Sequence, residues 1–279
     1  MTAARRLARL LLALVPFAAM PAAGVGAGCG ETPCEVAGGS YHLAAPAGWD
    51  GTTPLPAVLF FHGYGASGAS VLADAGLRDS VTRRGYLLIA PNGRDPEPGR
   101  NRSWAHQGSP FTGRDENAFI AGVMADTARR LPLRRDRVLV SGFSQGASMA
   151  WHVACFMGRD FAAFAPVAGA FWQPEPPACP GGPVRLLHLH GFADEVVPLE
   201  GRAIGDRWQQ GDVFEAMARL READGCHPEP DSITILDGRR CRAWSDCARG
   251  GELGLCLHDG GHELPEGWLD HVLDWFEAG

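Results

Sequence analysis

The chain has 279 residues, 46% of them hydrophobic, and a formal net charge of −7. This length is enough for one large core, and no Pro/Ser/Gly-rich linker or repeat divides it, so we expect a single domain over residues 28–279. An acidic chain without long runs of like charge is a poor partner for nucleic acid. All 25 basic residues are arginines, and the lack of lysine excludes Schiff-base, P-loop-lysine and Ser-Lys chemistry.

The first residues have the order of a secretory signal peptide. Arg5, Arg6 and Arg9 precede an apolar stretch over residues 10–20 and then a small-residue segment, A-A-G-V-G-A-G. We therefore predict a signal peptide over residues 1–27 and a secreted or periplasmic location, with an uncleaved anchor as the alternative. The apolar part is too short to span a bilayer comfortably, so no stable membrane insertion is expected.

Cysteine is the next informative residue type, because all eight copies follow the proposed cleavage site. An even number in an exported protein predicts disulfides, although the sequence leaves all 105 pairings open. The absence of a C-x-x-C pair argues against a metal site of the zinc type. Four cysteines fall within residues 226–256, which we expect to be a cross-linked loop region. The cysteines are Cys29, Cys34, Cys155, Cys179, Cys226, Cys241, Cys247 and Cys256.

Apolar runs of strand length alternate with stretches of helical spacing along the chain. The expected strands are residues 57–61, 86–90, 137–141, 164–168 and 185–190, with a weaker one at 253–258. The expected helices are residues 69–84, 117–131, 145–158, 206–223 and 268–277. This alternation predicts an α/β fold, a mostly parallel sheet with helices on both faces. Such sheets bind ligands at the carboxyl ends of their strands, so functional residues are expected just after each strand.

One of these strand ends reads G-F-S-Q-G (142–146), between the strand V-L-V-S and a helix with small residues. A strand–G-x-S-x-G–helix turn strains the serine backbone and exposes its hydroxyl above the sheet. We therefore predict Ser144 as a nucleophile. Ser148 is the competing serine, but it lies one turn inside the helix, where a packing role is expected.

A serine hydroxyl needs a base within hydrogen-bonding reach and an acid that fixes the tautomer of that base. In this type of fold the three follow the order serine, acid, histidine. Asp194 follows another strand and is the predicted acid, with Glu195 as the alternative. His262 lies in a Gly-Gly-preceded loop before the last helix and is the predicted base, with His258 as the alternative.

Acyl transfer also requires backbone amides that stabilise an oxyanion. The amide of Gln145, directly after the nucleophile, supplies one predicted donor. The second is expected from the glycine-rich loop H-G-Y-G (62–65), at Tyr64 or Gly65. His62 is expected to shape this loop rather than to act as a base.

The chain resembles a known group, the secreted α/β-hydrolase esterases of the polyhydroxybutyrate depolymerase and feruloyl esterase type. The resemblance spans most of residues 57–276 and implies Ser144, Asp194 and His262 as a catalytic triad. It also implies that Cys226 is disulfide-bonded. The segments that carry it are F-F-H-G-Y-G (60–65), A-P-N-G (90–93), D-E-N-A-F-I (115–120), D-R-V-L-V-S-G-F-S-Q-G-A-S-M-A (136–150), H-G-F-A-D-E-V-V-P (190–198), D-G-C (224–226) and G-G-H-E-L-P (260–265).

The sequence departs from this family near the expected substrate. Leu264 stands where the histidine loop often has tryptophan, and Gln145 and Ala147 stand where small residues or a second glycine are common. The chain shows no polymer-binding module and no Ser/Thr-rich linker. These features favour a soluble or partly soluble ester over a crystalline polymer.

Three aromatic residues are candidates for substrate binding. Trp104 lies in the longest irregular segment, where Arg100 or Arg102 could also pair with a carboxylate. Phe171 and Trp172 follow a strand and are candidates for an acyl-pocket wall. A packing role is the alternative for all three aromatic residues.

Together these features predict an exported serine esterase that hydrolyses small-molecule or polymeric esters through an acyl-enzyme, with no cofactor. The expected esters are polyhydroxybutyrate-type oligomers or feruloyl and acetyl esters. Two alternatives remain: a peptidase of the same fold, and an inactive secreted protein that binds glycans or aromatic compounds. The oligomeric state is left open.

Overall fold

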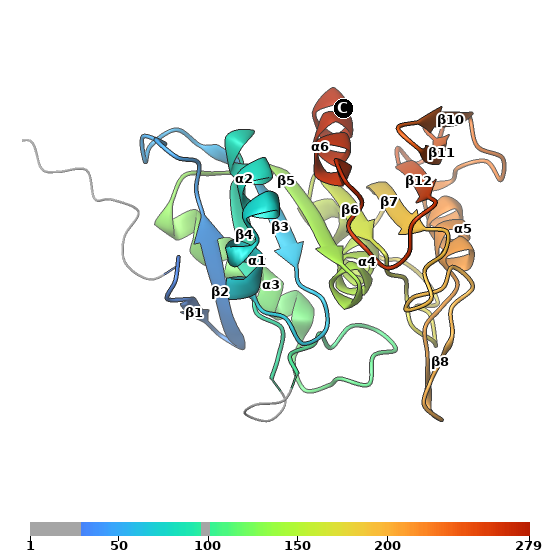
Figure 1. Cartoon of the computed structure of the whole chain (residues 1–279), viewed down its shortest axis with the longest axis horizontal. Coiled ribbons are helices and arrows are strands. Elements are labelled where there is room, and N and C mark those ends of the chain that lie inside the picture. Colours follow the sequence, from blue (N-terminus) through green and yellow to red (C-terminus); the bar gives the residue numbers. More distant parts are fainter. Residues whose placement is uncertain (1–28, 96–100) are drawn as a thin grey trace, which may run out of the picture.

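The computed structural model describes residues 29–95 and 101–279, and the predicted signal peptide lies outside these residues. A ten-stranded sheet forms the centre of the molecule, and helices cover both of its faces (Figure 1). The order of the strands is β1-β2-β4-β3-β5-β6-β7-β12-β11-β10. The predicted α/β class, with a mostly parallel sheet, is confirmed.

Six neighbouring strands of this sheet are parallel. Their apolar runs are buried because helices lie on both sides, as is typical of parallel sheets. Their carboxyl ends meet at one edge, which places the residues that follow them close together. The parallel strands are β4 (Leu87–Pro91), β3 (Leu55–Phe61), β5 (Leu133–Phe143), β6 (Ala163–Val167), β7 (Arg185–Gly191) and β12 (Glu252–His258).

The helices form two layers (Figure 1), each with its own cluster of buried apolar side chains. One layer contains α1 (Gly68–Ala73), α2 (Ala75–Arg83) and α6 (Trp268–Ala278); the other contains α3 (Glu116–Arg130), α4 (Gln145–Met157) and α5 (Val213–Asp224). A short 3-10 helix, Gly158–Asp160, follows α4.

Two helix predictions need correction. The single helix expected over residues 69–84 is two helices, because extended backbone at Asp74 ends α1 and its carboxylate accepts the Leu77 amide at 3.1 Å to start α2. The helix expected from residue 206 begins at Val213, where Asp212 caps α5. Before it lies a small hairpin of β8 (Ala203–Ile204) and β9 (Trp208–Gln209).

Both edges of the sheet are antiparallel, with β1 (Cys34–Val36) and β2 (Gly39–Ala44) at one and β10 (Ser232–Leu236) and β11 (Arg239–Trp244) at the other. The prediction of a loop region over residues 226–256 is therefore wrong. β10 and β11 meet at Asp237 and Gly238, both with positive φ, and Asp-Gly is the favoured two-residue hairpin turn.

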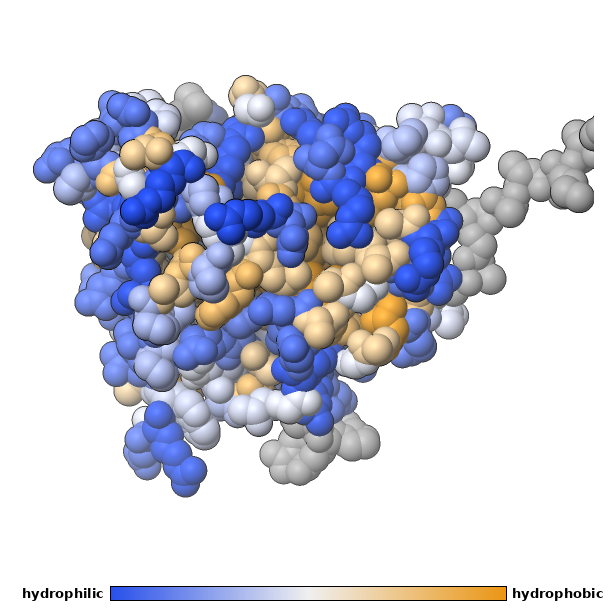
Figure 2. Space-filling view, turned by 180° about the vertical axis from the view of Figure 1, so that it is seen from behind, coloured by the Kyte–Doolittle hydropathy of each residue, from blue (hydrophilic) through white to orange (hydrophobic). Residues whose placement is uncertain are grey.

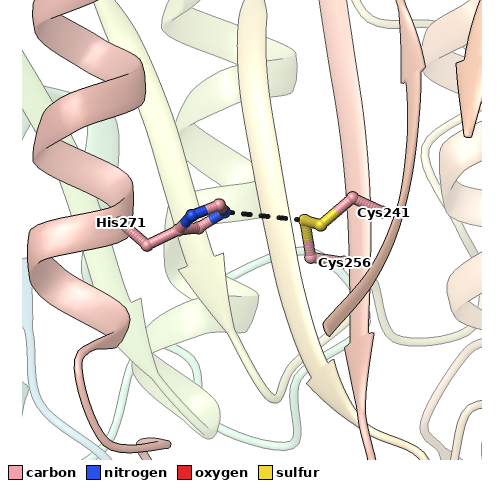
Figure 3. Close-up of side chains that lie close together, drawn as sticks. All are labelled: Cys241, Cys256 and His271. Carbon is pink, nitrogen blue, oxygen red and sulfur yellow. Dashed lines mark hydrogen bonds between the residues drawn. A yellow bond between two sulfur atoms is a disulfide. The ribbon is translucent and has the colours of Figure 1, made fainter. Parts of the chain in front are cut away.

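Four disulfides link all eight cysteines: Cys29–Cys34, Cys155–Cys179, Cys226–Cys247 and Cys241–Cys256. The expected bonding of Cys226 is confirmed. Cys241 and Cys256 join β11 to β12, and the imidazole of His271 on α6 lies against them, with Nε2 3.8 Å from the Cys256 sulfur (Figure 3). In the described part of the chain, no helix is long and apolar enough to cross a membrane.

Candidate active site

Ser144 lies in the tight turn between β5 and α4, with φ 58° and ψ −121°. This region of backbone space costs a residue other than glycine about 1–3 kcal/mol, and such strain is typical of functional sites. The neighbouring glycines permit the turn: a Cβ at Gly142 would collide with the Gly146 carbonyl, and a Cβ at Gly146 with the Phe61 carbonyl. β3, β5 and α4 therefore approach closely enough to present the Ser144 hydroxyl at the end of the sheet.

The structure brings the predicted serine, histidine and aspartate together from three separate strand ends. His262 Nε2 lies 2.8 Å from Ser144 Oγ, and His262 Nδ1 lies 2.8 Å from Asp194 Oδ2. The ring of Phe143 packs against His262, with the two centroids 4.8 Å apart. A neutral imidazole in this place donates Nδ1–H to the carboxylate and accepts the serine proton at Nε2.

The alternative acid and base are not part of this chain. Glu195 is exposed beside the buried Asp194. His258 ends β12, and its Nδ1 accepts the Gly260 amide at 3.1 Å instead of contacting Ser144.

Asp194 is held by more groups than sequence reasoning suggested. Its Oδ1 accepts the amides of Val196 and Val197 at 2.9 and 2.8 Å, and His190 Nε2 lies 3.4 Å from its Oδ2. Burial by itself raises the pKa of Asp194, but hydrogen bonds from His190, His262 and the Val197 amide hold that pKa below its usual range. The carboxylate is therefore charged at neutral pH.

His188 and His190 lie in β7, the strand expected over residues 185–190, and they extend this network behind Asp194. His190 Nε2 also lies 2.8 Å from the Val197 carbonyl, and its Nδ1 lies 2.9 Å from His188 Nε2. Since Nε2 faces two oxygens, it carries the hydrogen, and Nδ1 accepts from His188. Burial holds the pKa of His188 well below its ordinary value, so His188 is neutral. The spacing H-x-H-G-x-x-D (188–194) was the available signal.

The predicted oxyanion donors differ in whether their amides are free to bind. Gln145 begins α4, so its amide has no partner within the helix, and its side-chain oxygen accepts the Ser103 hydroxyl. Within the described residues, no acceptor is found for the Tyr64 amide, whereas Gly65 donates to the Arg102 carbonyl at 2.9 Å. Of the two predicted second donors, Tyr64 is therefore available and Gly65 is not.

His62 fastens the loop that carries Tyr64. Its Nδ1 donates to the Gly63 carbonyl at 2.7 Å and its Nε2 accepts the Gly93 amide at 2.9 Å. Burial lowers the pKa of His62 to about 4, so the ring stays neutral in both roles. The expected shaping role of His62 is confirmed.

Ser144 opens into a cleft of about 630 Å³, a volume typical of small-molecule sites. Tyr64 and Phe111 pack together at one side of it, with ring centroids 5.8 Å apart. The β8–β9 hairpin adds Ile204 and Trp208 at another. The remaining lining residues are Pro110, Gln145, Ser148, Trp172, Val196, Val197, Arg202 and Gln210.

Of the three aromatic residues predicted to bind substrate, only Trp172 lines this cleft. Trp104 is fully buried, and its indole donates to the His62 carbonyl at 2.8 Å, so it supports the loop from beneath. Phe171 is buried against Trp151, with centroids 5.3 Å apart. The prediction is wrong for Trp104 and Phe171, because hydrogen bonding and packing occupy them.

The arginine that lines the cleft is not one of the two that the sequence suggested. Arg102 does not line the cleft, and Arg100 lies outside the described residues. Arg202 does line it, and its Nε donates to the Val196 carbonyl at 2.8 Å. Trp208 falls within the helix expected over residues 206–223 and Arg202 falls in no expected element, so periodicity carried no signal for them.

One group of metal-ligating side chains occurs in the part of the chain that the structure describes: Cys241, Cys256 and His271, with ligand atoms within 4.8 Å of one another. The two sulfurs are bonded to each other, and a metal binds thiolate, not disulfide sulfur. We assign this cluster to packing between α6 and the sheet (Figure 3).

Comparison with known proteins supports an esterase. A probable feruloyl esterase C of Aspergillus niger is 26% identical over 254 residues, which cover 85% of this chain and 83% of that protein. Feruloyl esterase D of Neurospora crassa is 24% identical, with 91% and 87% covered. The chain resembles the feruloyl esterases. No model of a known protein family matches it.

Solved structures agree on the fold of this feruloyl esterase-like chain. An acetyl xylan esterase from Aspergillus awamori superposes with a TM-score of 0.62 at 15% identity, covering 87% of this chain and 95% of that one. A Bacillus cereus carboxylesterase gives a TM-score of 0.57 at 13% identity, with the same coverage. The predicted α/β-hydrolase fold is confirmed, and the relatives support a carboxylic ester hydrolase. Polyhydroxybutyrate as a substrate stays a prediction.

Proposed function

We propose that the chain is a serine esterase in which Ser144, His262 and Asp194 hydrolyse esters of aromatic carboxylic acids. The observation that carries this proposal is the continuous chain of two 2.8 Å contacts from Ser144 Oγ through His262 to Asp194. Ser144, at one end of this chain of contacts, lines a cleft that can hold a small ester. The strained backbone of Ser144 adds independent support.

The reaction proceeds in two acyl-transfer steps. His262 Nε2 takes the hydroxyl proton as Ser144 Oγ attacks the ester carbonyl carbon, and the carbonyl oxygen becomes an oxyanion. The amides of Gln145 and Tyr64 stabilise it, each by about 3 kcal/mol. Collapse breaks the bond to the alcohol, which leaves with the proton from His262. Water, deprotonated by His262, then attacks the acyl-enzyme and releases the acid and Ser144.

Aromatic acyl groups fit the cleft best. Tyr64, Phe111, Trp172 and Trp208 supply ring surfaces around Ser144, and aromatic side chains pack favourably against other rings. The relatives named feruloyl esterase point to the same class of acyl group. The acyl groups of polyhydroxybutyrate oligomers and acetyl esters lack an aromatic ring that could pack against these walls.

The nucleophile is tested by covalent labelling and by hydrolysis. A fluorophosphonate probe is expected to label the wild-type protein and Ser148→Ala but not Ser144→Ala. Ser144→Ala should also lower kcat for a short p-nitrophenyl ester by at least about 10⁴-fold, with an unchanged circular dichroism spectrum. Retained hydrolysis in Ser144→Ala would refute the mechanism. An unlabelled wild-type protein would favour the inactive binding protein instead.

The acyl preference is tested with a substrate panel. We expect the highest kcat/KM for methyl ferulate, above acetylated xylan, hydroxybutyrate oligomers and a feruloyl amide. Trp208→Ala should lower kcat/KM for methyl ferulate more than for p-nitrophenyl acetate, because only methyl ferulate has an aromatic acyl group. A higher rate on hydroxybutyrate oligomers would reassign the substrate, and a higher rate on the amide would indicate a peptidase.

We also propose that the chain is exported. The arginine-plus-apolar order of residues 1–27 and the four disulfides support this location. Expression with the natural N-terminus should place the protein outside the cytoplasm, with a new N-terminus near residue 28. Retention in the cytoplasm as a reduced protein would contradict the proposal.

A further inference from the structure

A second hollow, of about 530 Å³, lies outside the active-site cleft. Leu255 and Leu257, which line it, pack in the same apolar cluster as α5, so the hollow lies on the face of the sheet that carries α5. Strand register places two rows of side chains there, Ile235–Arg240–Leu257 and Ile233–Arg242–Leu255. Figure 2 shows this side of the molecule, where patches of hydrophobic surface are separated by strongly hydrophilic side chains.

The walls of this hollow are apolar to an extent that folding does not explain. Leu255 is buried beneath it, but Phe192 and Ile235 are 71% and 78% exposed, and Phe214 from the start of α5 is also exposed. Large apolar side chains gathered around a hollow, rather than scattered, mark a binding surface.

Two unpaired cations accompany these apolar walls. Arg240 and Arg242 line the hollow and are exposed, and neither forms an ion pair with a carboxylate of the described residues. Asp259 also lines the hollow, so the local formal charge is +1 in a chain whose net charge is −7. The site is thus complementary to a ligand that combines an anion with an apolar ring.

We propose that this hollow binds an aromatic carboxylate. Arginine presents N–H donors in a planar fork that matches both oxygens of a carboxylate. Arg240 and Arg242 hold the carboxylate, and the ring packs against Phe192 and Leu255. The choice of ferulate as the ligand rests on the proposed function, because hydrolysis of a feruloyl ester releases this acid; the apolar and cationic walls do not depend on it.

The hollow is joined to the active site by one short loop, residues 191–197. Phe192 lines the hollow, Asp194 contacts His262, and Val196 and Val197 line the cleft. Phe192 is further fixed by a hydrogen bond from its amide to the His258 carbonyl at 2.7 Å. An acid bound in the hollow therefore contacts the same segment that positions the proposed catalytic aspartate.

Methyl NMR of isoleucine-labelled and leucine-labelled protein distinguishes the two sites, because Ile235 lines the hollow and Ile204 lines the cleft. In the Ser144→Ala variant, added ferulate should shift the Ile235 and Leu255 signals in a saturable way. Methyl ferulate, which keeps the ring but lacks the charge, should leave the Ile235 signal in place, as should acetate, which has the charge alone.

Arg240→Gln/Arg242→Gln should raise the Kd for ferulate, measured from the Ile235 signal, about tenfold or more. Any ferulate effect at Ile204 should remain. The matched control is Arg134→Gln/Arg135→Gln, which removes the same charge from exposed positions of β5. It should leave the response of Ile235 and Ile204 to ferulate as in the parent protein.

Three results would overturn the inference: ferulate shifts only Ile204, methyl ferulate shifts Ile235 as strongly as ferulate, or the Arg240 and Arg242 substitutions have no effect. A saturated fatty acid that displaces ferulate at much lower concentration would overturn the aromatic assignment. Failure of the proposed function appears separately, as a wild-type protein that hydrolyses no ester while ferulate still shifts Ile235.

Discussion

The centre of the sheet and its outer strands are stabilised by different interactions. β3, β6, β7 and the buried second half of β5 are apolar, parallel and covered by helices on both faces. β10 and β11 are antiparallel, carry arginines and exposed isoleucines, and are tied down by disulfides at Cys226 and Cys241. The centre is fixed by packing and the outer part by cross-links.

This difference explains where the proposed chemistry lies. Ser144 occupies a strained turn that persists because β3, β5 and α4 pack tightly around it. The exposed outer strands offer no such constraint, and a ligand site there must rely on side-chain charge and apolar contact. Changes in the central part should therefore affect the reaction, and changes in the outer part should affect stability or binding.

Asp194→Asn is expected to have the largest effect. The asparagine amide would donate to His262 Nδ1, which moves the imidazole hydrogen to Nε2 and prevents it from accepting the Ser144 proton. We expect kcat to fall about 10⁴-fold with the fold intact, measured by steady-state hydrolysis and circular dichroism. Glu195→Gln, at the exposed neighbouring acid, is the control and should keep activity; an equal loss there would reassign the acid.

Glu116→Gln tests the packing of the centre. Glu116 and Arg114 form a buried ion pair at 2.8 Å beside the segment that contains Trp104, and Glu116 also accepts the Ala105 amide. Leaving Arg114 buried without its partner should lower the free energy of unfolding by about 3–5 kcal/mol in denaturant titrations.

The exposed pair Arg134–Asp136 provides the control for that measurement. Asp136→Asn should cost less than about 1 kcal/mol, because exposed ion pairs contribute little. Similar costs for Glu116→Gln and Asp136→Asn would contradict the buried-pair argument.

Cys241→Ala/Cys256→Ala tests the cross-linked outer strands. This disulfide closes a loop of 15 residues, so its loss should lower the free energy of unfolding by about 3 kcal/mol. Ester hydrolysis at 25 °C should change less than about twofold, because β12, the strand that precedes His262, keeps its backbone pairing with β7 and β11. Cys29→Ala/Cys34→Ala, with a separation of only 5 residues, should cost less. Loss of activity in the folded Cys241 and Cys256 variant would show that the two regions are coupled.

The sequence predicted the central part well, for a physical reason. Buried parallel strands read as continuous apolar runs, and the residues after them must gather at one edge, so Ser144, Asp194 and His262 could be chosen by position alone. The prediction that Trp104 and Phe171 bind substrate was wrong, because a large aromatic residue near a strand end has the same local pattern whether it lies in the core or in a cleft.

The outer part was harder to predict, because its strands are defined by pairing partners that local pattern does not reveal. β11 reads R-R-C-R-A-W, which resembles a solvated loop, and only the Asp237–Gly238 turn signalled a hairpin. The β8–β9 hairpin, with Trp208 and Ile204, is too short to show periodicity. Disulfide partners likewise depend on register, as for Cys241 opposite Cys256.

His190 gives the smallest predicted effect and the most specific one. Its Nε2–H lies near Asp194 Oδ2 at 3.4 Å, so His190→Leu removes a donor that shares the negative charge of the carboxylate. More of that charge then acts on His262 and favours its protonated form, which cannot accept the Ser144 proton. The acid limb of the pH profile of kcat/KM should therefore move to higher pH, with a loss of about threefold to tenfold at neutral pH.

His190→Gln is the matched variant, because an amide nitrogen there can restore the donor and return the acid limb toward its original position. A purely structural role would lower kcat/KM equally at every pH in both variants, without moving the limb. That outcome would remove His190 from the group that positions Asp194 and leave the two valine amides as the groups that hold the carboxylate. If the acid limb moves in His190→Leu and returns in His190→Gln, His190 is one of the groups of the central sheet that position Asp194.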